Sequence, residues 1–425
     1  MLDRNYLLEH AKLVKENIAK RNKPDKVKLV DDFLRADTDW RKIKSQLDQL
    51  RHRRNILSQE INTAKKNNKN VVPLVAEAKG LPQKVADLEK NEQELVGKIH
   101  DLLMRIPNIM HPSVPVGADE SKNPEVKKWG KIKKLDFELV SHAELAERLG
   151  LADFEAGREN TGKGFNYLIG ELAQLDLALQ RYGIDFLLEH GFVVVVPPVM
   201  LNRETLSGAV DLSAFEEVIY KIEGEDLYLI GTAEHALVSL MKNKIIPKEK
   251  LPFKICAVTP SFRKEIGGHG VDMKGIFRMH QFNKVEQVVY TLPEDSFKLL
   301  ETIQGITEKF FQSLVIPYRV IEICSGDLGG KFAKQYDIEA WFPRQNAYRE
   351  VTSAGNCTDY QARRLNITTQ TAEGKKHVHI LNNTMVATSR AMVAILENFQ
   401  NKDGTVTIPK VLHKYTGFKK MGVKT

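Results

Sequence analysis

The segment FRKEIGGHGVDMKGIFRMHQFNKVE, residues 262–286, has the pattern of a β-hairpin whose strands carry an unusual number of charges. Arg263 and Glu265 stand two residues apart before a glycine-rich loop, and a second row of alternating residues follows that loop. Because alternating residues of a strand share one face of a sheet, each row is expected on a single face. Such a face is either solvated surface or the floor of a binding site, and the hairpin alone leaves both open. The second row is Arg278, His280, Phe282, Lys284 and Glu286.

Short runs rich in β-branched and aromatic residues occur on both sides of this hairpin and alternate with longer helical stretches. They follow one another without the regular strand–helix–strand repeat of a Rossmann layout, which favours an α+β fold with a largely antiparallel sheet. The runs are GFVVVVPPV (191–199), EDLYLIGT (225–232), FKICAVTP (253–260), NKVEQVVYT (283–291) and YRVIEICSG (318–326).

The composition of the 425-residue chain is that of a soluble protein, with 42% hydrophobic and 28% charged residues. No apolar run is long enough to span a membrane, and the start MLDRNYLLEH lacks the apolar region of a signal peptide. Cys256, Cys324 and Cys357 are scattered and odd in number, which favours a reducing cytoplasm over a disulfide framework or a zinc site. The net charge of +8 fits a polyanionic partner without requiring one.

Residues 33–106 carry two apolar seams with steps of three and four residues, the pattern of coiled-coil helices. The Asn-rich segment KKNNKNVVP (65–73) separates them, and its final proline suits a helix start. Two matching seams joined by a short polar loop predict an antiparallel helical hairpin, with helices about 50 Å long. The Pro-rich segment RIPNIMHPSVPVG (105–117) then marks a linker.

The first of these helices is strongly basic, because residues 41–70 contain nine lysines and arginines against Asp48 and Glu60. Three interpretations fit this pattern: a solvated coiled-coil face, self-association, or contact with a nucleic-acid phosphate backbone. The basic residues are Arg41, Lys42, Lys44, Arg51, Arg53, Arg54, Lys65, Lys66 and Lys69.

The segment GRENTGKG (157–164) approaches the phosphate-binding P-loop pattern. Gly164, however, stands where that pattern requires Ser or Thr, and no buried strand precedes the segment, so a plain loop is predicted. The chain has no GxGxxG that opens a helix after a strand, no HExxH and no GxSxG, and its histidines lack metal-ligand spacing. Dinucleotide, zinc and nucleophilic chemistry are therefore not expected.

Three further segments carry many charged and polar residues for strand contexts: GTAEHAL (231–237), REVTSAGNCTDYQARR (349–364) and LNNTMVATSRAMVAILENFQ (381–400). In the last of them, a strand is followed by Arg390 at the head of an apolar helix. A positive charge there opposes the helix dipole, so this arginine suits an anion or an aromatic ring instead.

Together these segments resemble the signature motifs of class II aminoacyl-tRNA synthetases, in the form of the seryl-tRNA synthetase family. EHGFVVVVPPVM (189–200), with Pro198, resembles motif 1, the hairpin resembles motif 2, and residues 381–400 resemble motif 3. Further family motifs follow the helical hairpin in the family's order: TAE, FRxE, RxHQFxKVE and CTDYQARR. The resemblance therefore covers essentially the whole chain. It implies an α+β class II core in residues 113–425 after an N-terminal coiled-coil arm in residues 1–112.

The resemblance implies a serine–tRNA ligase that activates L-serine with ATP to seryl-adenylate, releasing pyrophosphate. Serine then passes to the 3′ end of tRNA(Ser), and of tRNA(Sec) where that tRNA is present. Magnesium, a homodimer through the motif 1 region, a cytoplasmic location and the absence of zinc are also implied. The basic residues of the arm would bind the long variable arm of tRNA(Ser), and His269 and Asp272 in the motif 2 loop would contact its acceptor end.

Roles carry over from the family to the matching positions, with Arg263, Glu286 and Arg390 as the catalytic set. Arg263 would bind the α-phosphate and the serine carboxylate, and Phe282 would stack on adenine with Arg390 on the other side. The serine-binding set is Thr232, Ala233, Glu234, Arg263, Glu286, Asn382 and Thr384. The ATP-binding set is Arg263, Lys264, Glu265, Arg278, Met279, Phe282, Lys284, Glu350, Val351, Thr352, Ser353 and Arg390, of which Glu350 and Ser353 would bind magnesium.

One departure from the family pattern is Asn383, which stands where relatives often have a glycine that adopts positive φ more easily. Three alternatives remain open. A homologue that aminoacylates a carrier protein would lack the arm, and an inactive RNA-binding relative would have lost part of the ATP set. The third alternative is a class II synthetase specific for a different amino acid. Measuring ATP–pyrophosphate exchange with a panel of amino acids would distinguish it.

Overall fold

The structure is a computed structural model that describes residues 1–265 and 275–422. It divides into two compact units. One consists of residues 2–19 and 23–107, and the other of Met1, residues 20–22 and the chain from Asn108 onward. Within the described residues, no helix combines the length and the apolar character that crossing a membrane requires.

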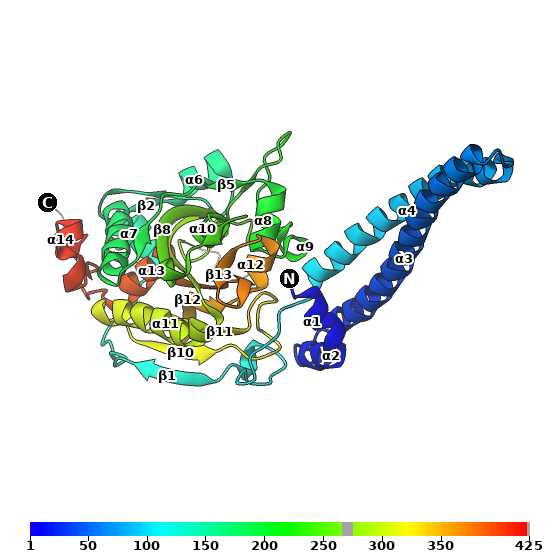
Figure 1. The fold of residues 1–425 in the computed structure, drawn as a ribbon. Coiled ribbons are helices and arrows are strands. Elements are labelled where there is room, and N and C mark those ends of the chain that lie inside the picture. The colour runs from blue at the N-terminus through cyan, green and yellow to red at the C-terminus, as the bar shows by residue number, and fades with distance from the viewer. Residues whose placement is uncertain (266–274, 423–425) are drawn as a thin grey trace. The chain divides into compact units, whose positions relative to one another are not determined.

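The first unit is a helical arm, and its two long antiparallel helices confirm the predicted hairpin (Figure 1). Asn68, in the polar segment between these helices, adopts a left-handed φ of 51°, and a proline lies in the first turn of the second long helix, as expected. At about 1.5 Å per residue, the 43 residues of the longer helix span about 65 Å. The helices are α1 (Arg4–Glu9), α2 (Ala11–Ala19), α3 (Pro24–Lys66) and α4 (Val72–Arg105).

The predicted seams of α3 and α4 form the contact between the two helices. Leu47 and Leu57 of α3 are fully buried, and Leu81 and Ile99 of α4 are 5% exposed. Arg54, the polar interruption of the first seam, is exposed. The arm is therefore held together by a narrow apolar stripe, as in a coiled coil.

The Pro-rich segment after α4, predicted as a linker, is packed against the second unit from Asn108 onward. The backbone N–H groups of Asn108 and His111 donate to the carbonyls of Gly330 and Ala333, both at 2.8 Å. Met110 is buried in a small apolar cluster of the second unit. Alternating apolar residues and these backbone hydrogen bonds thus build the segment into the second unit from Asn108 onward.

The second unit is built on an eight-stranded sheet within the described residues (Figure 1). Neighbouring strands are antiparallel except for the edge pair β4–β8, which confirms the expected α+β fold with a largely antiparallel sheet. The strands in spatial order are β1 (Glu125–Trp129), β10 (Tyr318–Glu322), β11 (Lys334–Phe342), β12 (Ala347–Asn356), β15 (His379–Ala387), β9 (Gln281–Thr291), β8 (Phe253–Phe262) and β4 (Val193–Val194).

The two faces of this sheet bury different sets of side chains. The odd-numbered Val285 and Val289 of β9 face the core formed with α7 (Gly170–Glu189), α11 (Ser296–Ser313) and α13 (Thr388–Asn398). The even-numbered Val288 and Tyr290 pack instead with α8 (Arg203–Ala209) and α10 (Ala233–Ser239). Period-two alternation therefore places Glu286 on the α10 face, where the charged row of the hairpin continues.

Smaller elements complete the second unit. The remaining strands form two-stranded pairs and one three-stranded sheet, and short helices connect them. The strands are β2 (Ala152–Asp153), β3 (Tyr167–Leu168), β5 (Met200–Leu201), β6 (Tyr228–Leu229), β7 (Ile245–Ile246), β13 (Thr368–Thr371), β14 (Gly374–His377), β16 (Val406–Thr407) and β17 (Lys420–Met421). The helices are α5 (His142–Arg148), α6 (Phe154–Thr161), α9 (Leu212–Phe215), α12 (Tyr360–Arg364) and α14 (His413–Thr416).

Asn383 of β15 needs no positive φ, because it is not among the described residues with that conformation. Its side chain points away from α10, and its amide donates to the carbonyl of Ile303 at 3.0 Å and the hydroxyl of Thr307 at 2.9 Å. An asparagine at this position thus ties the strand to α11 and leaves the face that carries Asn382 and Thr384 unchanged.

Candidate active site

The end of the charged row, Lys284 and Glu286, lies on the α10-facing side of the sheet. Phe282 and Glu286 are on β9, and the ladder continues beyond the strand ends, where the N–H of Arg263 donates to the carbonyl of His280 at 2.9 Å. The predicted row of Arg263 and Glu265 is wrong in one respect, because Glu265 turns into a left-handed conformation with φ of 45°. This turn takes Glu265 out of the strand geometry and brings it within 3.7 Å of the guanidinium of Arg278.

A cluster of buried polar side chains links α10 to β9. Thr232 is the N-cap of α10, and its hydroxyl accepts from the N–H of Glu234 at 3.3 Å and donates to the Glu286 carboxylate at 2.9 Å. The ammonium of Lys284 lies 2.6 Å from the same carboxylate and 3.2 Å from the Thr232 hydroxyl. Burial raises the pKa of Glu286, and Lys284 offsets part of that effect. Lys284, predicted as an ATP-binding residue, therefore contacts Thr232 and Glu286 of the predicted serine-binding set.

Glu234 is 6% exposed and pairs with two residues that the sequence analysis missed. Its Oε1 accepts from the ammonium of Lys331 and, at 2.9 Å, from the amide of Gln361. Burial alone would raise the pKa of Glu234, but Lys331 reverses that effect and the pKa lies below its usual range. Gln361 lies within the quoted CTDYQARR segment, whereas nothing in the sequence around Lys331 pointed to an acid partner.

His235 follows Glu234 on α10 and is 2% exposed. Its Nδ1 accepts from the N–H of Gly231 at 3.4 Å. Burial lowers the pKa of His235 to about 3, and the neighbouring Lys331 and Arg263 act in the same direction although Glu234 opposes them. The imidazole is therefore neutral and serves as a packed hydrogen-bond acceptor.

Arg263 reaches over the site from the end of β8. Its Nε donates to the carbonyl of Gly231 at 2.9 Å, and its guanidinium lies 5.5 Å from the ring centroid of Phe282. Burial lowers the pKa of Arg263, with a smaller opposing effect of Glu265. An arginine remains charged under such a shift, so a planar cation is held between the α10 N-terminus and an aromatic face.

Arg390, at the head of α13, is held by β12. Its Nη1 donates to the backbone carbonyl of Glu350 at 2.9 Å and lies 3.1 Å from the Glu350 carboxylate. The guanidinium also lies 5.4 Å from the ring centroid of Phe277, a residue that the sequence analysis missed. The predicted positive charge at this helix start thus serves an anion and an aromatic plane together.

Glu350 and Ser353 of β12 are the predicted magnesium ligands. The hydroxyl of Ser353 accepts from the amide of Gln335 at 3.0 Å, and Asp337 lies opposite Ser353 in the β11–β12 pairing. Burial, with Glu350 second, raises the pKa of Asp337 to about 8. Only oxygen donors are present, which fits a hard cation held by one carboxylate and substrate phosphates. Among the described residues, no group of three or more His, Cys, Asp or Glu could hold a metal by itself.

The remaining residues of the predicted ATP and serine sets lie around the hairpin and on β12 and β15. Lys264 is held by its N–H to the carbonyl of Val218 at 2.8 Å, and its ammonium faces the ring of Tyr220. Met279 is 6% exposed, and its sulfur accepts from the Asn166 amide at 2.6 Å. Asn382 and Thr384, each 3% exposed, lie on the same face as Glu286, whereas Val351 and Thr352 are 2% exposed within β12. His269 and Asp272 lie outside the described residues.

The segment that resembles motif 1 exposes apolar side chains. Val193 is 54% and Val196 93% exposed, and Pro198 is exposed as well. Leu177 of α7 adds a further side chain that is 62% exposed. Clustered exposed apolar residues of this kind are typical of a protein–protein contact.

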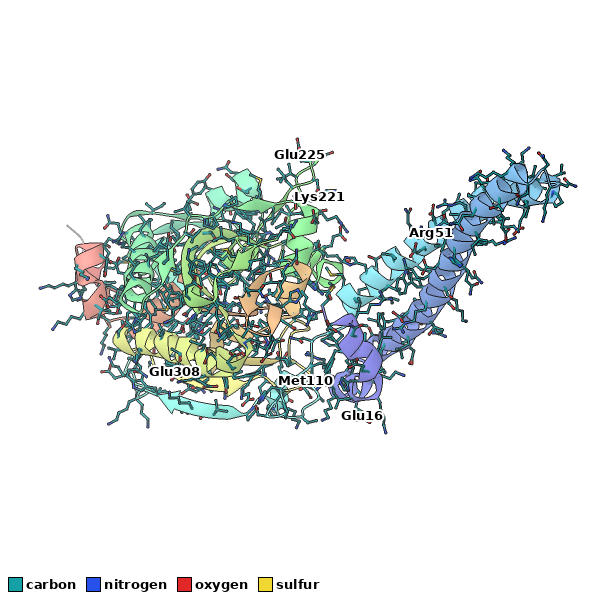
Figure 2. All side chains as sticks on the ribbon, viewed as in Figure 1. Glu16, Arg51, Met110, Lys221, Glu225 and Glu308 are labelled. Atoms are coloured by element: carbon teal, nitrogen blue, oxygen red, sulfur yellow. The ribbon has the colours of Figure 1, made fainter. Side chains whose placement is uncertain are left out.

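The nine basic residues of the arm fall into two groups. Arg51, which Figure 2 labels on the arm, pairs with Glu89 at 2.8 Å. Arg53 pairs with Glu77 at 2.7 Å, so α4 neutralises part of the charge of α3. Lys44 pairs with α4 in the same way, whereas Arg41 and Lys42 pair with acids of α3 itself. The second group lies toward the hairpin tip, and its members form no ion pair with any residue that the structure describes. They are Arg54, Lys65, Lys66 and Lys69.

Family models match both parts of the chain. The seryl-tRNA synthetase N-terminal domain matches residues 1–110, and the class II tRNA synthetase core domain (G, H, P, S and T) matches residues 217–399. The serine–tRNA ligase of Methanocella arvoryzae is 48% identical over 418 residues, which cover 98% of each chain.

Solved structures agree with this assignment. The crystal structure of seryl-tRNA synthetase from Pyrococcus horikoshii complexed with ATP matches with a TM-score of 0.94 and 47% identity, covering 99% of both chains. The cytoplasmic serine–tRNA ligase of Naegleria fowleri in complex with AMP matches with a TM-score of 0.89 and 33% identity, covering 100% of this chain and 99% of that one. The chain described here belongs to the seryl-tRNA synthetase family of class II aminoacyl-tRNA synthetases.

Proposed function

We propose that the polar face of the sheet beneath α10 is where this serine–tRNA ligase activates L-serine with ATP and transfers it to tRNA. The observation that carries the proposal is that Arg263, Glu234 and Glu286 meet on the α10 face of the sheet from distant parts of the chain. Arg390, at the head of α13, acts electrostatically on Arg263. Buried charges are unfavourable unless they are paired, so a fold that collects them at one place retains them for a purpose other than stability.

Activation needs orientation and charge stabilisation, not a proton-transfer residue. A carboxylate oxygen of serine bonds to the α-phosphorus of ATP, the bond from that phosphorus to the bridging oxygen breaks, and pyrophosphate leaves. The fork-shaped guanidinium of Arg263 contacts both anions and stabilises the charge that develops on the α-phosphate. Holding the two reactants in register supplies the remaining acceleration.

The adenine and the phosphates have separate holders. In the proposed arrangement Phe282 stacks on the adenine, Glu265 accepts from its amino group and the backbone of Met279 contacts its edge. Arg278 and Arg390 hold the outer phosphates. Glu350 and Ser353 bind magnesium, which supplies further neutralisation of the phosphate charge when it is bound.

Serine recognition rests on paired buried groups. Glu234 and Glu286 accept from the ammonium, Thr232 and Asn382 complete the pocket, and Glu286 with Thr384 reads the hydroxyl. Alanine would leave these buried polar groups without a partner, which a polar pocket penalises strongly. The amide nitrogen of Asn382 is buried without a hydrogen-bond partner in the described residues, as expected for a donor that binds the substrate.

We assign tRNA binding to the N-terminal arm, residues 1–112, and catalysis to residues 113–425. The unpaired cations near the arm tip would follow the backbone of the long variable arm of tRNA(Ser), a contact that reads shape more than base sequence. The exposed apolar residues around β4 and α7 support a homodimer through the motif 1 segment. Three buried free cysteines, Cys256, Cys324 and Cys357, support a cytoplasmic location.

The test is serine-dependent ATP–pyrophosphate exchange with a panel of amino acids, followed by charging of tRNA(Ser). Exchange with serine alone, and charging of that tRNA, are the expected results. Exchange with a different amino acid would overturn the serine assignment. Exchange followed by transfer to a phosphopantetheine carrier but not to tRNA would favour the carrier-protein homologue, and no exchange at all would favour an inactive relative.

A further inference from the structure

Lys331 carries a buried ammonium that the proposed reaction does not use. The residue lies between β10 and β11, its side chain is 20% exposed, and the ammonium contacts the Oε1 atom of Glu234. Gln361 donates to the same oxygen from α12 at 2.9 Å. One oxygen of Glu234 is therefore fully engaged, which leaves the other to face the substrate.

The loop that carries Lys331 is fixed by two buried side chains of the same unit. The amide of Asn108 donates to the carbonyl of Lys331 at 2.9 Å and to that of Cys357 at 2.8 Å. The guanidinium of Arg21, only 1% exposed, donates to the carbonyls of Leu328, at 2.9 Å, and Phe332, at 3.0 Å.

Five hydrogen bonds from Arg21 and Asn108 thus converge on residues 328–332 and hold the backbone on both sides of Lys331. Burying an arginine and an asparagine in this way is unfavourable unless their hydrogen bonds are made, and here the partners are mainly backbone carbonyls. The loop is consequently a rigid support for the lysine side chain and not a mobile surface segment.

We propose that Lys331, held by Asn108 and Arg21, is a positioning residue that orients the Glu234 carboxylate for the ammonium group of serine. The inference rests on the proposed function, because it assigns Lys331 to the amino acid subsite of that reaction. Lys331 itself does not touch the substrate. It fixes one carboxylate oxygen of Glu234 and keeps the group charged.

The surrounding charges explain why a cation is required at this place. Glu234 and Glu286 lie in one buried pocket, and their repulsion together with burial favours protonation of one of them. The charged and titratable groups that act on Glu234 are Lys331, His235, Glu286, Lys284 and Cys357. Among these cations, Lys331 is the one that contacts Glu234 directly.

Lys331→Met tests the proposal, since it keeps the length of the side chain and removes the charge. The expected result in the exchange assay is a KM for serine that rises about 10- to 100-fold, as for the loss of a charged hydrogen bond, with the KM for ATP unchanged. Because the pKa of Glu234 would rise, the acid limb of kcat/KM for serine should move to higher pH. Lys331→Arg, which keeps the charge, should restore the acid limb of the wild type.

Asn108→Ala tests the placement of the Lys331 side chain apart from its charge. The variant removes a hydrogen bond that holds the loop but keeps the lysine and its positive charge. It should raise the KM for serine without moving the acid limb. Lys127→Met removes a lysine that pairs at 2.6 Å with Glu308 of α11, which Figure 2 labels. It serves as the control with unchanged KM values. Should Lys331→Met fail to fold, Lys331→Gln, which keeps a donor without the charge, carries the same expectation.

Two outcomes would overturn the inference: equal changes in the KM for serine and for ATP, or an acid limb that stays in place in Lys331→Met. Wild-type protein that exchanges a different amino acid, or none, would instead refute the proposed function. The two failures are therefore distinguishable, because one appears in the wild type and the other only in the variants.

Discussion

Gly164 lies directly against His280: the backbone carbonyl of Gly164 accepts from the N–H of His280 at 3.0 Å, and a Cβ on this glycine would come within 2.4 Å of the His280 ring. The His280 ring also contacts the Phe165 ring at 5.1 Å and the Tyr220 hydroxyl at 2.5 Å. The GRENTGKG segment, which resembled a phosphate loop, thus packs behind the return limb of the ATP hairpin. It supports Met279 and His280 and binds no phosphate itself in the proposed arrangement.

Gly164→Ala should weaken ATP binding by pushing His280 and the neighbouring Met279 out of place. We expect the KM for ATP in exchange to rise by about tenfold or more, since small displacements near reacting groups are costly. The KM for serine should stay the same. Gly162→Ala is the matched control, because Gly162 also has a positive φ, of 112°, but nothing lies within 4 Å of its Cβ position. Equal effects of the two variants would contradict the support role.

Arg263→Ala should abolish serine-dependent exchange, with a loss of about a thousandfold or more, because one preorganised cation contacts both reacting anions. Arg263→Lys should recover little, since an ammonium cannot contact two anions as a planar fork does. Arg319→Ala, which removes an arginine paired with Glu339 on the same sheet, is the control and should leave exchange intact. Exchange at the wild-type rate in Arg263→Ala would refute the role assigned to this residue.

The sequence predicted the arm and the strands well because their patterns are local. Seam residues such as Leu47 and Leu57 repeat with the period of a helix, and the alternation in FKICAVTP and NKVEQVVYT is that of strands with buried faces. The roles of the predicted site residues could be inferred only from several segments together, because no single segment is specific for one function. The coincidence of TAE, the hairpin and the Arg390 segment supplied that signal.

Long-range pairing could not be read in the same way. Lys331 meets Glu234 across 97 residues, and Asn108 meets Cys357 across 249, so no local pattern announces either contact. The packing of the Pro-rich segment after α4 could not be predicted either, because prolines indicate turns but not whether a turn is packed. A deletion up to the predicted domain boundary at residue 112 would remove Asn108 and should disturb the proposed serine subsite.

The unpaired cations at the arm tip should carry the tRNA contact. The quadruple variant Arg54→Gln, Lys65→Gln, Lys66→Gln and Lys69→Gln should leave exchange unchanged and lower kcat/KM for charging of tRNA(Ser). The salt dependence of charging should become shallower, by a slope of about one for each phosphate that the arm no longer neutralises. Both quantities follow from steady-state charging at several salt concentrations.

A charge-neutral double variant provides the control for this prediction. Arg51→Gln with Glu89→Gln removes an ion pair between α3 and α4 and keeps the net charge of the arm. It should reduce charging much less than the quadruple variant does. Wild-type charging by the quadruple variant would show that the tip does not contact tRNA.

His235 makes the stability of the catalytic unit depend on pH in a defined direction. Burial lowers its pKa in the folded chain to about 3, from 6.5 for an unperturbed histidine. Below pH 6.5 the unfolded chain therefore takes up a proton that the folded chain does not. The stabilising contribution is fully present above that pH and is lost progressively as the pH falls toward about 3.

His235→Gln should remove this part of the acid sensitivity, because a glutamine does not titrate and can still accept from the N–H of Gly231. The wild type should lose about 1.4 kcal/mol of stability per pH unit from this residue below pH 6.5, a slope that the variant lacks. Urea denaturation of the full chain at about pH 7 and about pH 5 measures the difference in unfolding midpoint. His52→Gln, an exposed histidine of α3, is the control and should retain the slope of the wild type. If His235→Gln and the wild type lost stability equally between these pH values, the histidine would have to be charged in the folded protein.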